Sequence, residues 1–203
     1  MPGFPEPMTD LAIDPRQTGF VRLHLPDLFG NTNPVVVEIG SGKGRFLIET
    51  AMERPDLSLL GIEKSLHYHR LIRDRAVKRG LTNVRLINHD AFVVMQKMLA
   101  PESIAEVHVY FPDPWPKRKH ERHRLISPRF AETAVLALAV GGDIYLRTED
   151  AAYFRQMNAV FQAHRRFGLV ETPAALAAVV TDFEREFQAR GIATLRAAYR
   201  RIA

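Results

Sequence analysis

The chain has 203 residues, of which 46% are hydrophobic, with 28 Lys or Arg against 23 Asp or Glu. This composition is typical of one globular α/β domain, which at this length buries enough surface to fold without disulfides or a structural metal. There is no cysteine, which excludes a disulfide framework, a zinc ribbon and a thiolate nucleophile.

The first 33 residues are rich in Pro and Gly and show no sustained hydrophobic period, so we expect an extended arm or a lead-in helix over residues 1–33. Over residues 34–203, short apolar runs alternate with longer segments of helical period, which indicates one domain with helices packed on a parallel sheet. The first five expected strands are Val35–Ile39, Leu57–Ile62, Val84–Ile87, Ala105–Phe111 and Asp143–Arg147. The helices expected between and after them are Arg45–Arg54, Leu66–Arg79, Phe92–Leu99, Pro128–Val140 and Ala151–Arg165.

The C-terminal part predicts a strand over Gly168–Glu171, a helix over Asp182–Arg190 and a last strand over Ile192–Arg200. Two strands joined by such a connection can pair as an antiparallel hairpin at the end of the sheet. The predicted fold class is therefore α/β, with a doubly wound, Rossmann-like, mostly parallel sheet that ends in an antiparallel hairpin.

Most of the excess positive charge lies in two blocks. The first, Lys64–Arg79, has six basic residues and one acid on a predicted helix, where a solvated helix face and a binding surface are both reasonable interpretations. The second, Lys117–Arg124, adds two histidines to its basic residues and follows a segment rich in proline and aromatic residues. That composition is typical of a loop that contacts phosphates and bases.

The first predicted strand ends in a glycine-rich turn, EIGSGKG, directly before a predicted helix. Gly40, Gly42 and Gly44 allow a sharp turn and let a ligand lie against bare backbone at the helix N-terminus. The third glycine of a dinucleotide fingerprint is missing, which disfavours NAD. At the end of the second strand, Glu63 is suitably placed to accept hydrogen bonds from both hydroxyls of a ribose, so the pair favours an adenosine without a pyrophosphate.

Two further acids end neighbouring strands. Glu38 precedes the glycine turn, and Asp90 follows the third strand. Asp90 either caps the helix that begins at Phe92 or holds the adenine amino group. Because the carboxyl ends of parallel strands share one edge, we expect Glu38, Glu63 and Asp90 to converge on one crevice. Such carboxylates suit S-adenosylmethionine, which carries ribose hydroxyls, an ammonium and a sulfonium.

The fourth strand ends in the segment FPDPWPK, residues 111–117. Three prolines around Asp113 and the single tryptophan, Trp115, predict an irregular loop at the mouth of the crevice. The alternative is a purely structural turn with Trp115 as its apolar plug. Amino methyltransferases place an Asp/Asn-Pro-Pro-aromatic motif at this point, and this chain lacks the second proline, so its target need not be an exocyclic amine.

These motifs resemble those of the bacterial tRNA (guanine-N7)-methyltransferases. The resemblance runs from Val35 onward and is most specific in FPDPWPKRKHERHRL, residues 111–125, with EIGSGKG and GIEK in support. It implies a class I methyltransferase domain over 34–203 that uses S-adenosylmethionine. The implied reaction forms N7-methylguanosine in the variable loop of tRNA, at position 46 in tRNA numbering.

The resemblance also implies roles for individual residues. The cofactor-binding residues would be Glu38, Glu63, Asp90 and Asp113, together with the turn glycines Gly40, Gly42 and Gly44. Asp113 would also be the catalytic residue, and Lys117 would contact the substrate. Thr181 and Glu184, in a Thr-x-x-Glu segment, would do the same, although this spacing is equally that of a helix capping box. Where the family has Thr-Asp after the fifth strand, this chain has Thr148-Glu149-Asp150, so either Glu149 or Asp150 takes that role.

The chemistry of the expected reaction needs few functional groups. Guanine N7 has a lone pair and no proton, so it attacks a methyl group without a general base. Orientation dominates, and a carboxylate such as Asp113 stabilises the purine as it becomes cationic. Two alternatives stay open, namely an amino methyltransferase acting on adenine or cytosine and a catalytically silent RNA-binding module.

The expected partner is tRNA, whose phosphates would contact the basic side chains Arg118, Lys119, Arg122 and Arg124. We expect no metal, because the histidine pairs lack a suitable carboxylate spacing and have basic neighbours. The longest apolar run, Ala134–Val140, is too short for a membrane span, and the N-terminus shows no secretory signal, so we expect a cytoplasmic protein. A monomer and a homodimer are both compatible with the sequence.

Overall fold

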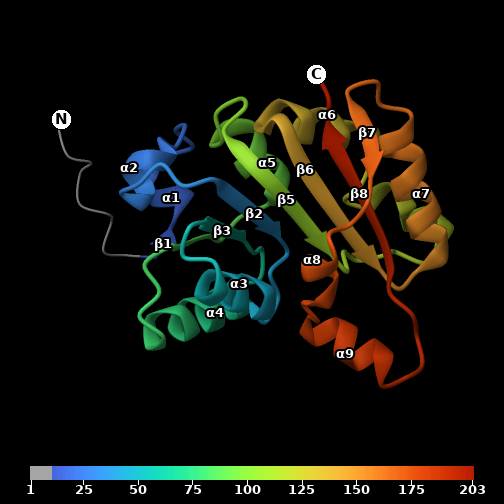
Figure 1. Cartoon of the computed structure of the whole chain (residues 1–203), viewed down its shortest axis with the longest axis horizontal. Coiled ribbons are helices and arrows are strands. Elements are labelled where there is room, and N and C mark those ends of the chain that lie inside the picture. Colours follow the sequence, from blue (N-terminus) through green and yellow to red (C-terminus); the bar gives the residue numbers. More distant parts are fainter. Residues whose placement is uncertain (1–10) are drawn as a thin grey trace.

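The computed structural model describes residues 11–203, which form an eight-stranded sheet with helices on both faces (Figure 1). The strands are β1 (Ala12–Ile13), β2 (Val35–Ile39), β3 (Ser58–Ile62), β4 (Val84–Ile87), β5 (Ile104–Tyr110), β6 (Leu138–Thr148), β7 (Phe167–Val170) and β8 (Leu195–Arg201). The helices are α1 (Pro15–Thr18), α2 (Leu25–Phe29), α3 (Arg45–Glu53), α4 (Leu66–Lys78), α5 (Ala91–Lys97), α6 (Pro128–Ala137), α7 (Ala151–Gln162), α8 (Ala174–Ala178) and α9 (Asp182–Gln188), with a 3₁₀ helix η1 (Arg118–His123).

The strands lie in the order β1-β4-β3-β2-β5-β6-β8-β7. Neighbouring strands are parallel except at β8, which is antiparallel to both β6 and β7. Strand β2 pairs with β3 on one side and with β5 on the other, so the winding of the chain reverses there. Ligands of doubly wound sheets bind at such a switch point, outside the carboxyl ends of the strands. The predicted fold class is confirmed.

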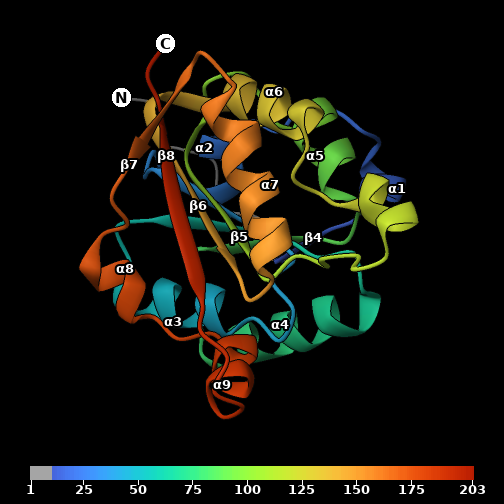
Figure 2. The same ribbon diagram turned by 90° about the vertical axis from the view of Figure 1, so that its right-hand side faces the viewer.

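Helices cover both faces of the sheet (Figure 2). On one face α2, α5, α6 and α7 pack over a core that includes Val37, Val107 and Phe130. On the other face α3 and α4 pack over Val36 and Leu59. Because both faces are covered, β2, β3 and β4 are buried along their whole length, which explains their continuous apolar sequences. None of the helices within residues 11–203 has the length and apolar character needed to cross a membrane.

Part of the expected N-terminal arm packs onto this domain. Strand β1 extends the sheet beside β4, with Ala12 opposite Leu86. Helix α2 buries Leu25, Leu28 and Phe29 in the core. Elements of two to five residues are too short to show a hydrophobic period, so the sequence does not predict them. Residues 1–10 of the expected arm lie outside the described residues.

The expected helix Pro128–Val140 ends earlier than predicted. Helix α6 stops at Ala137, and β6 begins at Leu138. A short apolar run fits a helix and a buried strand equally, which is why its end was misplaced. Within β6, a Cβ on Gly142 would lie 2.7 Å from the carbonyl oxygen of Ala105, near the point where the pairing with β5 shifts register. The sequence also does not predict η1 or α8, which are short helices of six and five residues.

Candidate active site

The glycine turn joins β2 to α3 at the switch point of the sheet. Gly40, Gly42 and Gly44 have φ values of +75°, +51° and +78°, which side chains of L residues rarely adopt. Gly44 is also packed closely, because a Cβ there would lie 2.7 Å from the Ile72 side chain. A Cβ on Gly40 would meet nothing within 4 Å. The backbone at Gly40 is therefore open to a ligand near the N-terminus of α3.

Glu38, the acid before this turn, is only 3% exposed. Its Oε2 atom is buried and has no hydrogen-bond partner among the described residues. Burial is the main cause that raises the pKa of Glu38 to about 7. The Ser41 hydroxyl lowers this pKa, whereas the charge of Glu63 raises it further. A buried carboxylate with an unpaired oxygen favours a cationic partner, and the ammonium group of an amino acid fits this requirement.

Glu63 and Asp90 lie beyond the ends of β3 and β4. The Glu63 carboxylate accepts hydrogen bonds from the backbone N–H of Gly42 at 2.9 Å and of Ser65 at 2.7 Å. It links the glycine turn to the end of β3, and its oxygens keep further lone pairs for ribose hydroxyls. Asp90 caps α5 by accepting the N–H of Phe92 at 3.0 Å. The capping interpretation is thus confirmed, and the contact to adenine stays a prediction.

The loop after β5 has an uncommon backbone conformation. Phe111 and Trp115 have φ values of 51° and 43°, and such conformations of non-glycine residues often occur at active sites. Asp113 lies between them, and its Oδ1 accepts the N–H of Trp115 at 3.0 Å. The side chain of Asp113 is exposed. The loop therefore presents an exposed carboxylate from a constrained turn shortly after the carboxyl end of β5.

The basic loop begins with side chains that point into solvent. Lys117, Lys119 and Arg122 are exposed, as expected for residues that contact an RNA backbone. Arg118 begins η1, and its side chain lies outside the described part of the structure. Trp115 contacts the ring of His120 in η1, with centroids 5.8 Å apart, so the basic loop packs against the Asp113 turn.

Arg124, the last residue of this loop, has an internal role. It is 7% exposed, and its guanidinium donates to the Pro114 carbonyl at 2.7 Å and to Gln156 at 2.6 Å. It also lies 5.0 Å from the centroid of the Tyr153 ring. The structure contradicts the phosphate contact predicted for Arg124, because these groups already hold the guanidinium. The residue instead fixes the Asp113 turn to α7.

The two acids after β6 differ in their surroundings. Asp150 caps α7, and its carboxylate accepts the N–H of Tyr153 at 2.7 Å. The Oε2 atom of Glu149 is buried and has no hydrogen-bond partner among residues 11–203. A buried acceptor without a partner is costly, so a donor on a ligand would stabilise it. Of the two alternatives, Glu149 is the better candidate for contact with the substrate.

The Thr-x-x-Glu segment is also partly internal. Thr181 accepts the N–H of Glu184 at 3.2 Å, which confirms the helix-capping interpretation for this residue. The Glu184 side chain is fully buried, with its carboxylate 2.9 Å from Arg147 and paired with Arg196. In this conformation both oxygens of Glu184 are engaged within the protein, and its contact with the substrate stays a prediction. Thr181 lines the hollow at the glycine turn and stays a candidate.

Arg147 in β6 is a site residue that the sequence does not reveal. It is 1% exposed, and its guanidinium lies 4.2 Å from the centroid of the Tyr110 ring. It donates to the carbonyl oxygens of Leu176 at 2.5 Å and Val179 at 2.6 Å. Arg147 therefore positions the segment that leads into α9. One feature of the sequence does indicate such a role: Arg147 lies in a mostly apolar strand, and a buried charge there needs partners.

Helix α9 closes over the glycine turn. Two salt bridges hold it there, Arg45–Asp182 at 2.7 Å and Lys43–Glu186 at 3.1 Å. Phe183 lies over Gly42, with its ring 3.5 Å from the position of a Cβ on that glycine. The space left between the turn and α9 is about 20 Å³, on the order of one water molecule. The glycine turn and α9 therefore leave little enclosed space between them.

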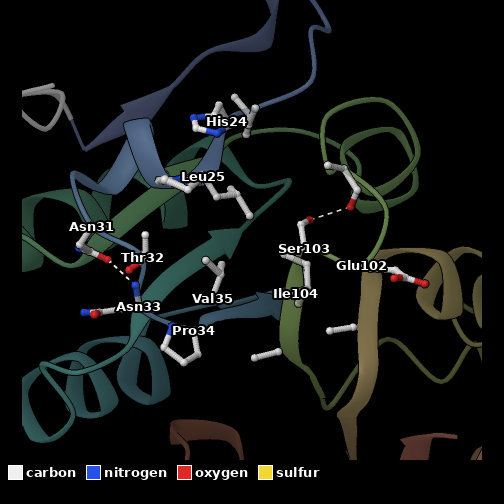
Figure 3. A pocket seen from close by; sticks show the side chains of 15 residues that line it. His24, Leu25, Asn31, Thr32, Asn33, Pro34, Val35, Glu102, Ser103 and Ile104 are labelled. Atoms are coloured by element: carbon white, nitrogen blue, oxygen red, sulfur yellow. Dashed lines mark hydrogen bonds between the residues drawn. The ribbon is translucent and has the colours of Figure 1, made fainter. Parts of the chain in front are cut away.

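A second hollow, of about 360 Å³, lies at the opposite edge of the sheet, where α2 meets the beginnings of β2 and β5 (Figure 3). Two of its polar side chains are paired within the protein. Ser103 donates to the Ala100 carbonyl at 2.7 Å, and Glu102 pairs with Arg201 at 2.7 Å. Among the described residues, the buried carboxylate oxygens without a hydrogen-bond partner belong to Glu38 and Glu149. Glu38 is the last residue but one of β2, and Glu149 directly follows β6. No group of His, Cys, Asp or Glu within residues 11–203 is arranged to hold a metal ion.

Comparison with known proteins identifies the family. Residues 32–197 match the family described as "Putative methyltransferase". A tRNA (guanine-N(7)-)-methyltransferase from Streptomyces avermitilis is 41% identical over 145 residues, which are 71% of this chain and 50% of that protein. One from Nitrosomonas eutropha is 38% identical over 152 residues, which are 75% of this chain and 67% of that protein. The chain belongs to the tRNA (guanine-N7)-methyltransferase family. It spans about half to two thirds of the length of these relatives.

Solved structures share the fold of this family member. The 16S rRNA methyltransferase KamB has a TM-score of 0.62 at 14% identity, covering 84% of this chain and 89% of KamB. TrmN from Thermus thermophilus has a TM-score of 0.60 at 16% identity, covering 87% of this chain and 49% of TrmN. At such low identity the likeness concerns the fold alone.

Proposed function

We propose that this protein transfers a methyl group from S-adenosylmethionine to N7 of a guanine in the variable loop of tRNA. The observation that carries the proposal is the unpaired, buried carboxylate oxygen of Glu38 beside the glycine turn, in a chain whose relatives bear that enzyme name. The reaction would take place in the cytoplasm, where tRNA is found.

The residues at the switch point fit S-adenosylmethionine. Glu38 would bind the ammonium group, because a buried carboxylate without a partner favours a cation. Glu63 would accept the ribose hydroxyls, and Asp90 the adenine amino group. Gly40 leaves its backbone open to the ligand. Once bound, this cofactor supplies an electrophilic methyl group attached to a sulfonium.

The residues around the crevice would orient the guanine. Asp113 would lie near the purine and stabilise the positive charge that develops there. Glu149 would accept a hydrogen bond from N1–H or the amino group of guanine, which pairs its buried oxygen. Thr181 and Lys117 would complete the substrate contacts. The side chains do not need to remove a proton, because N7 carries none.

The exposed part of the basic loop would hold the tRNA backbone. Lys119 and Arg122 are exposed, and Arg118 lies next to them in the sequence. Contacts of lysine and arginine to phosphates supply affinity without reading the sequence. Recognition of the target guanine would then depend on the acids of the crevice.

The test is methyl transfer by the full chain to an unmodified tRNA transcript with labelled S-adenosylmethionine, followed by nucleoside analysis. We expect N7-methylguanosine at one site in the variable loop. A methylated adenine or cytosine would keep the cofactor site and overturn the assignment of the target base. Binding of tRNA without any transfer would overturn the enzymatic function and favour an RNA-binding module.

A further inference from the structure

A second basic surface lies beside the glycine turn, between α3 and α4. A hollow of about 350 Å³ separates the two helices, and we refer to it as the α3–α4 hollow. Its lining residues are Gly44, Arg45, Ile48, Glu49, Met52, Arg75 and Arg79. Three of these side chains are arginines and one is an acid. The basic loop of Lys117–Arg124 contributes nothing to this lining.

The three arginines differ in how far their charge is compensated. Arg45 pairs with Glu49 at 2.7 Å and with Asp182 at 2.7 Å, so two carboxylates neutralise it. Arg75 donates to the Lys43 carbonyl at 2.6 Å, and Arg79 donates to the Arg75 carbonyl at 3.2 Å. Neither of these two guanidiniums forms a salt bridge within the described part of the chain. Both keep unused donors and a full positive charge at the hollow.

Helix α4 extends this charge along the surface. Its buried face consists of His69, Ile72 and Ala76, so the basic side chains lie on the other faces. Arg70 and Lys78 are exposed, and α4 contains one acid among its thirteen residues. A helix of this length extends about 20 Å, which is longer than a single nucleotide. The charge pattern therefore fits an extended polyanion better than a small anion.

The position of the hollow connects it to the active site. The bond from Arg75 reaches the carbonyl of Lys43, which belongs to the glycine turn. Helix α4 begins three residues after Glu63, the acid that accepts the Gly42 N–H. Figures 1 and 2 both show α3 and α4 side by side on the face of the sheet that α9 also approaches. An RNA bound at the crevice mouth would pass beside this surface.

We propose that the α3–α4 hollow binds phosphate groups of the tRNA backbone, with Arg75 and Arg79 as the phosphate ligands. This inference rests on the proposed function and adds a second contact surface to the basic loop. Arginine presents paired N–H donors in a geometry that matches phosphate oxygens. Two separated contacts on one tRNA would orient the molecule, so that the variable loop lies at the crevice.

The first test compares tRNA binding by the parent chain and the Arg79→Gln variant over a series of salt concentrations. We expect the variant to bind tRNA about three- to tenfold more weakly near 0.1 M salt. The slope of the logarithm of the binding constant against the logarithm of the salt concentration should decrease by about the amount of one phosphate contact. Arg165→Gln is the matched control, because Arg165 is exposed and follows α7, where the chain leads into β7. Equal binding by R79Q and R165Q would overturn the proposal.

Two further measurements separate the possible failures. The Arg75→Gln and Arg79→Gln double variant should bind tRNA more weakly still. Its affinity for S-adenosylmethionine, measured by calorimetry, shows whether the glycine turn is intact. If inorganic phosphate stabilises the parent but not R79Q, and tRNA binds both equally, the hollow is a small-anion site and the proposal is wrong. If the parent methylates tRNA and R79Q binds it normally, only this inference fails. Absence of both methylation and tRNA binding in the parent would overturn the proposed function itself.

Discussion

At the scale of single residues, the acids of the site have different environments that suit different tasks. Asp113 is exposed on a constrained turn, whereas Glu38 is buried with an unpaired oxygen. Glu63 has its carboxylate bonded to two backbone N–H groups. These environments suit the proposed roles, namely charge stabilisation by Asp113, cation binding by Glu38, and organisation of the turn with ribose contacts by Glu63.

Replacement of Asp113 should reduce catalysis without unfolding the protein. We expect Asp113→Ala to lower the rate of methyl transfer about 10²- to 10³-fold, as for loss of one group that stabilises transition-state charge. The measurement is the initial rate with saturating tRNA and cofactor. Asp113→Asn is the control, because it retains the acceptor for the Trp115 N–H and removes only the charge. Transfer by the alanine variant at the parent rate would contradict the catalytic role.

Glu38 should make stability depend on pH. Its pKa is raised to about 7 from 4.5, mainly by burial. Between these values the folded protein keeps the proton and the unfolded chain loses it, so the free energy of unfolding falls as pH rises. Above pH 7 Glu38 is ionised in both states, and the loss of free energy of unfolding reaches its full value of about 3 kcal/mol. Below pH 4.5 Glu38 is protonated in both states, and this loss of free energy of unfolding disappears.

We therefore expect Glu38→Gln to be more stable than the parent at pH 8, by up to about 3 kcal/mol, with little difference near pH 4.5. Urea unfolding at the two pH values, without cofactor, measures this. The variant should also lose affinity for S-adenosylmethionine in calorimetry, because the amide lacks the charge. An equal stability difference at both pH values would show that ionisation of Glu38 is not the cause.

At the scale of elements, α9 is connected to the sheet by a buried ion pair. Glu184 from α9 contacts Arg147 of β6 at 2.9 Å, and Arg196 of β8 pairs with it as well. Removal of the carboxylate leaves the positive charges of these two arginines without their shared partner. We expect Glu184→Ala to lower the free energy of unfolding by about 3–5 kcal/mol. Circular dichroism during urea unfolding measures this loss.

A second variant controls for the lost volume of the side chain. Glu184→Gln keeps the shape and removes only the charge, so it should retain part of the stability. A loss below about 1 kcal/mol in both variants would place this pair among weakly contributing surface ion pairs. In that case the burial of Glu184 would not explain how α9 is positioned.

The two salt bridges between α9 and the glycine turn should control access to that turn. The double variant Asp182→Asn, Glu186→Gln removes both bridges from α9, the part-buried one to Arg45 and the exposed one to Lys43; an exposed bridge contributes about 0.2–1 kcal/mol. We expect cofactor dissociation to become about two- to tenfold faster in stopped-flow measurements. Glu49→Gln is a matched control, because it removes the other partner of Arg45 within α3 and leaves α9 untouched. The same rate change in this control would contradict closure by α9.

At the scale of the whole molecule, the acids of the candidate site lie at one edge of the sheet because the strands share a direction. Glu38, Glu63 and Glu149 come from segments far apart in the sequence, and they follow or end parallel strands that point to one edge. The two basic surfaces, Lys117–Arg122 and the α3–α4 hollow, approach the same edge from different elements. In the hollow of Figure 3, at the other edge, Ser103 and Glu102 are paired internally.

The sequence by itself determined the alternation of strands and helices, the glycine turn and the constrained loop around Asp113. These features depend on local properties, namely hydrophobic period, positive φ at glycine and the fixed φ of proline. The capping of α5 by Asp90 was an expected alternative for the same reason, since a capping residue contacts backbone only a few positions away.

The tertiary structure alone decided which charged side chains are paired within the fold. Arg124 is held by Gln156, which is 32 residues away, and Glu184 by Arg147, which is 37 residues away. The choice between Glu149 and Asp150 likewise depended on which carboxylate had a partner in the fold. The physical reason is that spacing in the sequence specifies local backbone, whereas burial and ion pairing depend on residues brought together only when the sheet forms.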